Sequence, residues 1–173
     1  MYRTHTCGEL RVGHAGQTVT LSGWVNRRRD HGGLVFFDLR DRSGITQINI
    51  NPDLPKETLD LIANVRMEWV LQIEGKVQKR PAGNENPNMA TGEIEVVALR
   101  VQALNPAKTP PFMVSGENDL TDENTRLKYR YLDLRRDRMT TKLVLRHKAA
   151  KFMCANLVKK GFIEMETPIM FKA

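Results

Sequence analysis

The chain has 173 residues, of which 40% are hydrophobic and 27% charged, and it carries a formal net charge of +7 with a pI near 9.6. These proportions are typical of a soluble globular protein and argue against a disordered chain. No apolar run is long enough to cross a bilayer, and the start lacks the order of a signal peptide, so we expect a cytoplasmic protein with no membrane partner. The positive charge favours an acidic partner, with nucleic acid as the first candidate.

Neither the cysteines nor the catalytic motifs predict a metal or cofactor in this chain. Cys7 and Cys154 have no CxxC motif and no His partner at metal-ligand spacing, so we expect ordinary reduced thiols. The motifs GxSxG, GxxxxGK[ST] and HExxH are all missing from the sequence. Glu164 and Glu166 alternate along a predicted strand, which fits a solvated strand face better than an acid–base pair.

Three short strands are predicted near the start of the chain. Apolar and polar residues alternate over 17–27 with the period of two that is typical of a half-buried strand. The DHGG sequence at 30–33 supplies turn residues, and a second strand is expected over 34–41. A Ser-Gly turn then leads into a third strand over 45–51.

The hydrophobic period then changes. A short helix is predicted over 55–65, where a proline suits the first turn and apolar residues follow at helical spacing. Alternation returns over 69–79 and 93–104, with a polar loop between these two strands. Three strands, a helix and two more strands is the order of the OB-fold, a five-stranded Greek-key barrel that often binds oligonucleotides. We therefore predict a mainly β fold, with an OB-fold domain over 1–104.

The rest of the chain has a different character. Residues 105–120 contain several prolines and are predicted to form a linker. Residues 121–173 are mainly helical in pattern, with a helix start at Thr121 to Glu123 and a second helix from about 140 to 160. His147 lies on the apolar stripe of that helix and is interpreted as a packed histidine rather than a ligand.

Phe36 is predicted to point away from the barrel core. Alternation places Val35, Phe37 and Leu39 on one face of the second strand and Phe36 on the other. On the third strand, Gln47 can share the face that carries Phe36. A large aromatic ring on a polar face costs solvation free energy unless something covers it.

These residues are the parts needed to hold a single-stranded base. The Phe36 ring can stack on a base, the Gln47 amide can read a Watson–Crick edge, and the arginines at 27–29 can neutralise phosphates. The alternative is that Phe36 belongs to a second apolar cluster and that the arginines form a solvated, ion-paired surface. The coincidence of all the parts on the expected binding strands of a barrel favours the first interpretation.

Three segments, GWVNRRRDHGGLVFFDLRDRSGITQI, MATGEIEV and RLKYRYLDLR, closely resemble the N-terminal portion of bacterial aspartyl-tRNA synthetases. The related lysyl and asparaginyl enzymes share the barrel, but the first two segments look most like the aspartyl type. The segment GFIEMETPIM at 161–170 resembles motif 1 of class II aminoacyl-tRNA synthetases, here with Gly161, Thr167 and Pro168.

The resemblance implies an aspartate–tRNA ligase. Residues 121–173 would be the helical hinge and the incomplete start of a class II α+β catalytic domain, and motif 1 would build a homodimer interface. ATP and Mg are implied for the full-length enzyme. The sequence ends before anything that resembles the motifs for ATP and aspartate, so we expect this chain alone to be inactive.

The resemblance also implies that the barrel binds the anticodon loop of the aspartate tRNA. Carried over by position, Phe36 would stack on the central uridine, Gln47 would read it, Arg29 would contact the same loop, and Glu95 would contribute to base recognition. Strand alternation independently supports Phe36 and Gln47 but not Arg29 or Glu95.

Some bacterial members of this family charge both the aspartate and the asparagine tRNA, whose anticodons differ at the third base. His31 and Gly83 lie on the two predicted loops that would flank that base, and neither offers a side chain to reject U. We therefore hypothesise non-discriminating recognition. A hypothesis of another class is a stand-alone OB module that binds single strands with little sequence preference, although such a module has no reason to carry GFIEMETPIM.

Overall fold

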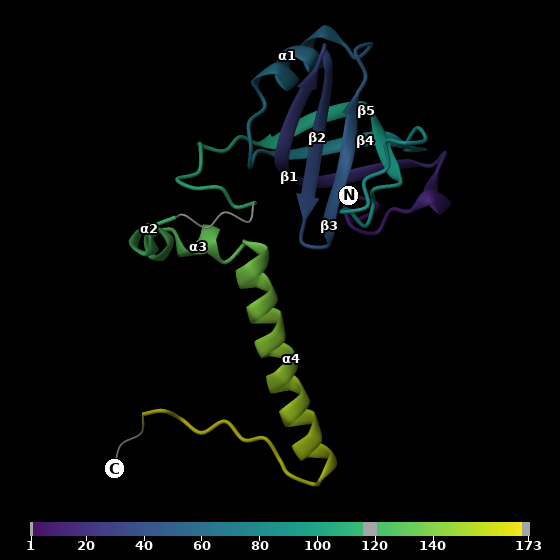
Figure 1. The fold of residues 1–173 in the computed structure, drawn as a ribbon. Helices are drawn as coiled ribbons and strands as arrows, with labels where there is room; N and C mark the ends of the chain where they lie inside the picture. Colours follow the sequence, from purple (N-terminus) through teal and green to yellow (C-terminus); the bar gives the residue numbers. More distant parts are fainter. Residues whose placement is uncertain (1, 116–120, 171–173) are drawn as a thin grey trace. The chain divides into compact units, whose positions relative to one another are not determined.

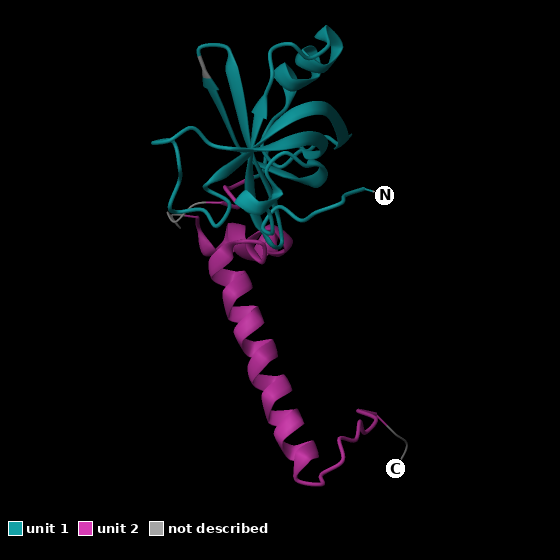
Figure 2. Cartoon of the chain, turned by 90° about the vertical axis from the view of Figure 1, so that its right-hand side faces the viewer, with its two compact units in different colours: residues 1–110 teal, residues 111–173 magenta. Residues whose placement is uncertain are grey.

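The computed structural model describes residues 2–115 and 121–170, and the side chain of His31 lies outside that description. The chain divides into two compact units, Met1–Pro110 and Pro111–Ala173 (Figure 2). The first unit takes in the start of the predicted linker, up to residue 110. Residues 116–120 of that linker lie outside the described residues.

Five strands of the first unit close into a barrel in the order β1-β2-β3-β5-β4 (Figure 1). All neighbouring strands are antiparallel except β3 and β5. The α-helix α1 lies between β3 and β4, and a short 3₁₀ turn precedes β1. The predicted five-stranded OB-fold with one helix is confirmed. The elements are η1 Val12–His14, β1 Thr18–His31, β2 Leu34–Asp41, β3 Gly44–Ile50, α1 Lys56–Asn64, β4 Val70–Lys79 and β5 Ile94–Asn105.

The first strand is longer than predicted. It continues to His31 because its second half pairs with Leu34–Asp38 of β2, after a bulge between Val25 and Arg27. The bulge resets the alternation, so a pattern with a strict period of two cannot follow the strand past that point. Gly32 and Gly33 alone make the turn, with φ of 60° and 92°. Two positive φ values are the requirement of a two-residue hairpin turn that matches the twist of the strands.

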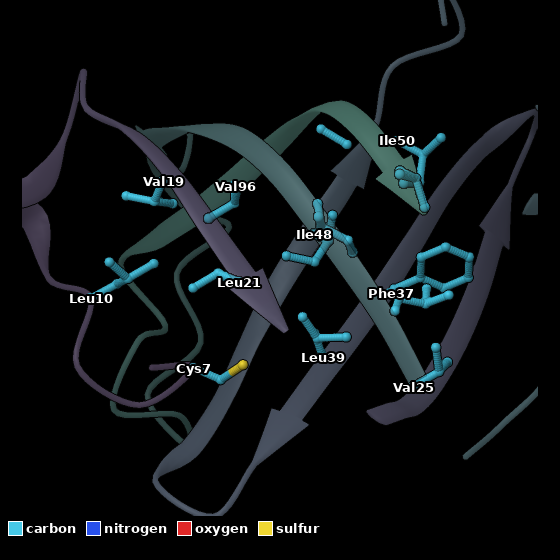
Figure 3. Close-up of a cluster of buried hydrophobic side chains, with 14 of the residues drawn as sticks. Cys7, Leu10, Val19, Leu21, Val25, Phe37, Leu39, Ile48, Ile50 and Val96 are labelled. Atoms are coloured by element: carbon cyan, nitrogen blue, oxygen red, sulfur yellow. The ribbon is translucent and has the colours of Figure 1, made fainter. Parts of the chain in front are cut away.

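The barrel core is continuous and is filled by the inward residues of every strand (Figure 3). Phe37 and Leu39 are fully buried, and Val35 packs against the cluster, as the alternation of the second strand predicts. Gly75 lets two strands approach, because a Cβ there would lie 2.5 Å from the carbonyl oxygen of Val97. A side chain at this position would force the strands apart.

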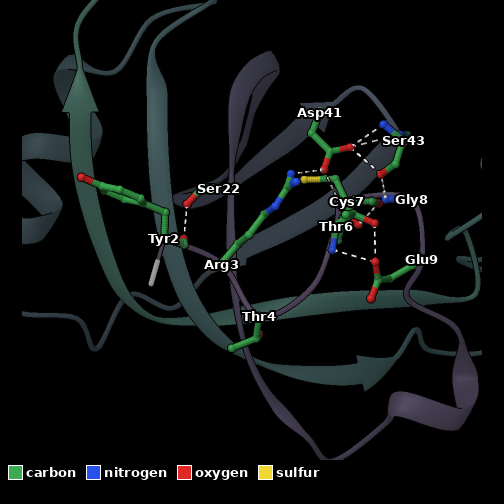
Figure 4. Close-up of polar contacts among 12 residues, drawn as sticks. Tyr2, Arg3, Thr4, Thr6, Cys7, Gly8, Glu9, Ser22, Asp41 and Ser43 are labelled. Carbon is green, nitrogen blue, oxygen red and sulfur yellow. Dashed lines mark hydrogen bonds and ion pairs between the residues drawn. The ribbon is translucent and has the colours of Figure 1, made fainter.

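Asp41 ties the N-terminal segment to the hairpin between β2 and β3 (Figure 4). Its carboxylate accepts hydrogen bonds from the backbone nitrogens of Cys7 at 2.9 Å and Ser43 at 2.7 Å, and Arg3 forms an ion pair with it at 3.4 Å. Burial alone raises the pKa of the Asp41 carboxyl, but the hydrogen bonds from Ser43, Cys7 and Gly44 outweigh it and hold this pKa below its usual range. Burial also raises the pKa of the neighbouring Cys7 thiol, which favours the neutral thiol.

The second unit consists of α2 Glu123–Lys128, α3 Arg130–Asp133 and α4 Asp137–Lys159. The side chain of Asp122 caps α2 by accepting from the backbone nitrogen of Thr125 at 3.1 Å. Gly161, with φ of 87°, ends α4, and the backbone nitrogen of Phe162 donates to the carbonyl of Leu157 at 3.1 Å. This is the Schellman pattern of a helix C-terminus.

Two expectations for the second unit are wrong. The stripe of α4 that carries His147 is exposed, so that histidine is not packed within the described residues. The segment around Glu164 and Glu166 is not a strand, because a strand needs a hydrogen-bonded partner strand and residues 162–170 pair with none in the described part of the chain. Among the described helices, none is long and apolar enough to cross a membrane.

Candidate nucleic-acid interface

A pocket of about 400 Å³ lies on the barrel, at the outer face of β1, β2, β3 and β5 and the loop that follows β4. Its lining includes all four residues that were predicted to contact an anticodon. The lining residues are Arg29, Phe36, Gln47, Asn49, Arg80, Pro81, Asn84 and Glu95.

Strand register brings these side chains together. Arg29 of β1 lies directly opposite Phe36 of β2, and Phe36 lies directly opposite Asn49 of β3. In the next row, Asp38 lies opposite Gln47. Directly opposed residues in an antiparallel pair share one face of the sheet. Arg29, Phe36, Asn49 and Gln47 therefore line one pocket, and Asp38 lies on the same face, bonded to Arg29.

A chain of hydrogen bonds runs across the floor of the pocket. Nη2 of Arg29 donates to Oδ1 of Asp38 at 2.5 Å and to Oε1 of Gln47 at 3.0 Å. Nε2 of Gln47 donates to Oε2 of Glu95 at 3.0 Å, and Nδ2 of Asn49 donates to Oε1 of Glu95 at 3.1 Å. Five polar side chains from four strands are therefore held in one network.

Two guanidinium groups in this pocket keep buried donors without an acceptor, namely Nε of Arg29 and Nη2 of Arg80. Arg80 is only 6% exposed, and its Nε donates to the carbonyl of Ile94 at 2.9 Å. Burial lowers the pKa of Arg80, with an opposing effect of Glu95. Because an unsatisfied buried donor is costly, the pocket is suited to a ligand that brings acceptor oxygens or nitrogens.

Phe36 and its neighbour Phe37 have different environments. Phe37 is fully buried in the core, whereas Phe36 is half-buried and lines the pocket beside Arg29 and Gln47. The ring therefore borders a pocket that is lined largely by polar and charged side chains, rather than a second apolar core. This arrangement offers a stacking surface next to hydrogen-bonding groups, which is the combination that single-stranded nucleic acids use.

The three consecutive arginines do not act together. Arg28 points to the other face of β1, where Nη1 donates to the carbonyl of Ala63 near the end of α1 at 2.9 Å. The prediction that residues 27–29 all face an anionic loop is therefore wrong for Arg28, because alternation along the strand separates it from its neighbours. Arg27 is exposed, and Arg29 reaches the pocket.

Gly83, one of the two predicted discrimination residues, is not among the residues that line the pocket, and the side chain of His31 lies outside the described part of the chain. Gly83 has φ of 89°, and its backbone nitrogen donates to Oε2 of Glu85 at 2.8 Å, while Pro81 and Asn84 of the same loop line the pocket. The backbone of His31 pairs with Leu34 at the end of the β1–β2 hairpin. Their roles stay predictions.

Three members of the site were missed from the sequence. Asn49 shares the face of Gln47, so alternation along β3 could have indicated it. Asp38 lies on the predicted face, but its burial beside Arg29 follows from side-chain packing. Arg80 directly follows β4, at the start of a loop, where no period predicts a buried direction.

A larger pocket, of about 560 Å³, lies beneath the N-terminal segment and includes Tyr2, Trp24 and Val70 in its lining. Charged groups around it already serve to anchor that segment, as in the ion pair of Arg3 with Asp41. Across residues 2–115 and 121–170, no group of three or more His, Cys, Asp or Glu side chains is arranged to hold a metal ion.

Comparison with known families assigns both parts of the chain. Residues 19–104 match the model of the OB-fold nucleic acid binding domain of the tRNA anticodon type. Residues 122–173 match the model of class II tRNA synthetases for aspartate, lysine and asparagine. The chain belongs to this class II tRNA synthetase family. The second match also disfavours a stand-alone single-strand-binding module, because a synthetase segment follows the barrel.

Within the family, aspartate enzymes are close relatives of this chain. It is 53% identical over 171 residues to the aspartate–tRNA(Asp/Asn) ligase of Heliobacterium modesticaldum, a match that covers 99% of this chain and 28% of that ligase. It is 52% identical over 173 residues to the ligase of the same name from Dehalococcoides mccartyi strain BAV1, covering 100% of this chain and 29% of that ligase. The chain thus spans less than a third of the length of these curated relatives.

Solved synthetase structures share the fold. The asparaginyl-tRNA synthetase of Pyrococcus horikoshii, in complex with asparaginyl-adenylate, matches with a TM-score of 0.84 and 22% identity over 98% of this chain and 37% of that chain. The aspartyl-tRNA synthetase of Entamoeba histolytica matches with a TM-score of 0.82 and 20% identity over 94% of this chain and 38% of that chain.

Proposed function

We propose that the barrel binds the anticodon loop of a tRNA and reads its bases, as the RNA-recognition part of an aspartate–tRNA ligase. The observation that carries the proposal is the pocket that gathers Arg29, Phe36, Gln47 and Glu95 on one barrel face. The match of the barrel to the anticodon-type OB-fold model supports the same function.

Each side chain of the pocket has a chemical role in this proposal. The ring of Phe36 stacks on the central uridine of the anticodon, and Gln47, which keeps one lone pair and one N–H beyond its internal bonds, reads that base. Glu95 accepts hydrogen bonds from base N–H groups, because a carboxylate is an acceptor only. Arg29 and Arg80 supply donors for carbonyl or phosphate oxygens.

In the whole protein, the proposed reaction is the ATP-dependent aspartylation of tRNA, and the proposed location is the cytoplasm. Parts of the whole protein other than this chain would bind the ATP and Mg. This chain alone is inactive and supplies recognition. We also propose that the whole protein is a homodimer, with Gly161, Thr167 and Pro168 of the 161–170 segment at the dimer interface. Apolar side chains of that segment are strongly exposed, with Ile169 at 99%, which supports a covering partner in the whole protein.

The third anticodon base is proposed to be read without discrimination, so that both tRNA(Asp) and tRNA(Asn) are substrates. Gly83 has no side chain, and a Cβ at this position would meet open space, so this residue presents no group that could exclude U. His31 is the second residue of this proposal. The names of the relatives, aspartate–tRNA(Asp/Asn) ligases, support it.

Binding to RNA stem-loops at two salt concentrations tests the proposal. We expect the chain to bind a stem-loop with the aspartate anticodon more tightly than one with a scrambled loop of equal charge, at both concentrations. The asparagine loop should bind within tenfold of the aspartate loop. Equal affinity for the scrambled loop would overturn base reading, and a preference well above tenfold for the third-base C would overturn the non-discriminating part alone.

A further inference from the structure

We infer that Asp38 and Asn49 are positioning residues that fix the orientation of the Gln47 amide, and that this fixed orientation makes the pocket select a uracil edge over a cytosine edge. The inference rests on the proposed function, because it concerns the base that Gln47 reads. Asp38 and Asn49 form the two ends of the hydrogen-bond chain across the pocket.

The two neighbours of Gln47 allow only one amide orientation. A guanidinium has donors only and a carboxylate has acceptors only. The amide oxygen of Gln47 therefore faces Arg29, at 3.0 Å, and the amide nitrogen faces Glu95, also at 3.0 Å. A reversed amide would set an N–H group against the guanidinium and an oxygen against the carboxylate.

The neighbours are themselves held in place. Asp38, which is 9% exposed, fixes Nη2 of Arg29 through the 2.5 Å ion pair. Asn49 fixes the second oxygen of Glu95. Long side chains such as arginine have many rotamers, so without Asp38 the Arg29 guanidinium is free to turn toward a phosphate and release the Gln47 oxygen.

A fixed amide distinguishes two pyrimidines that a mobile amide would bind equally. Uracil presents a carbonyl beside a ring N–H, which matches the remaining N–H and lone pair of Gln47 in its observed orientation. Cytosine presents an amino group beside an unprotonated ring nitrogen, which is the reverse order. Cytosine would therefore need the amide orientation that Arg29 and Glu95 oppose. Selectivity for uracil then depends on the residues that fix the amide orientation of Gln47 as well as on Gln47 itself.

The test compares the 173-residue chain with the variants Asp38→Ala, Asn49→Ala and the double variant. Each is titrated with RNA stem-loops that are identical except for U or C at the central anticodon position. Asp60→Ala is the matched control, since it removes an exposed carboxylate of α1 that takes no part in the hydrogen bonds of the network. Phe36→Ala is included to test the proposed function, and circular dichroism checks the fold of each variant.

We expect the unmodified chain to prefer the U loop by about tenfold or more, the range of one good bidentate contact. Each single variant should lower this ratio by at least about threefold, and the double variant should bring it below about threefold, with Asp60→Ala unchanged. If Asp38→Ala does not fold, the half-exposed position of Asn49 makes Asn49→Ala the deciding variant. A preference for U that survives in the folded variants overturns this inference alone. Equal binding of all loops by the unmodified and Phe36→Ala chains overturns the proposed function and this inference together.

Discussion

The two units of the chain differ in where their charge and their apolar surface lie. Residues 1–110 carry 14 Lys and Arg against 12 Asp and Glu, a net charge of +2, whereas residues 111–173 carry 13 against 8, a net charge of +5. The unit with the candidate RNA pocket is therefore the less basic one. Overall charge favours an acidic partner, but it does not locate the candidate site, which contains the buried Arg80 and the half-buried Arg29 rather than a broad basic surface.

The two units also differ in how much of their apolar surface is buried. The buried apolar side chains of the barrel form one cluster, whereas Phe152, Leu157 and Met153 of α4 are at least half exposed. A helix with exposed apolar residues gains little stability from its own unit. The barrel has the packing of a complete domain, and the described part of the second unit does not.

The largest expected difference between the units is in stability. Replacement of Phe37 by Ala should lower the free energy of unfolding by about 3–5 kcal/mol, because it leaves a cavity in the closed core. The matched truncation Leu143→Ala on α4, where the side chain is 44% exposed, should cost less than about 0.5 kcal/mol. Urea unfolding of both variants measures the difference, and a similar destabilisation in the two would show that α4 packs as the barrel does.

The next effect concerns Asp41, a buried carboxylate that holds the N-terminal segment of the barrel. Asp41→Asn should cost about 1.5–3 kcal/mol at neutral pH, the value of hydrogen bonds to a charged group. Because the folded-state pKa of Asp41 lies below its unfolded value of about 3.9, its contribution is complete above that value and is lost as the pH falls through the folded pKa.

Unfolding measurements from pH 7 down to the acid limit check this dependence. The difference between the unmodified chain and Asp41→Asn should shrink only below about pH 4. The exposed residue Asp53 provides the control variant, Asp53→Asn, with little effect at any pH. A difference that stays constant into acid would show that the carboxylate charge of Asp41 is not what stabilises the N-terminal segment.

The smallest expected effect separates charge from base reading. Replacement of Lys148 or Lys151 of α4 by Ala should weaken the binding of every stem-loop by less than about 1 kcal/mol. The salt slope should fall by about 1 for each phosphate that the variant no longer neutralises. The ratio of affinities for the U and C loops should stay the same. A changed ratio would place part of the base recognition in the second unit.

Periodicity alone predicted the barrel and the face of Phe36, because alternation along a strand follows directly from the geometry of the backbone. It failed where the backbone departs from the period. Strict alternation could not follow β1 past the bulge after Val25, where pairing with β2 continues. The separation of Arg28 from the pocket, by contrast, obeys alternation, which the prediction for the run of three arginines did not apply. The segment around Glu164 is not a strand, since pairing depends on a neighbour that a local pattern does not contain.

The candidate site was predictable only in part. Gln47 and Phe36 follow from alternation, and resemblance added Arg29 and Glu95, all of which line one pocket. Asp38 and Arg80 were missed because their burial and partners are set by tertiary packing, not by spacing in the sequence. A solvated strand face would leave these two charged side chains exposed, and their burial is what indicates a pocket instead.

Phe36 and Phe152 provide the most direct test of the account, since one ring lines the pocket and the other is 70% exposed on α4. The measurement is the affinity of a stem-loop with the aspartate anticodon for the unmodified chain, Phe36→Ala and Phe152→Ala. Loss of stacking predicts that Phe36→Ala weakens binding by about 1–3 kcal/mol, while Phe152→Ala leaves it unchanged. Unchanged affinity in a folded Phe36→Ala chain would contradict the central claim that this pocket holds a base.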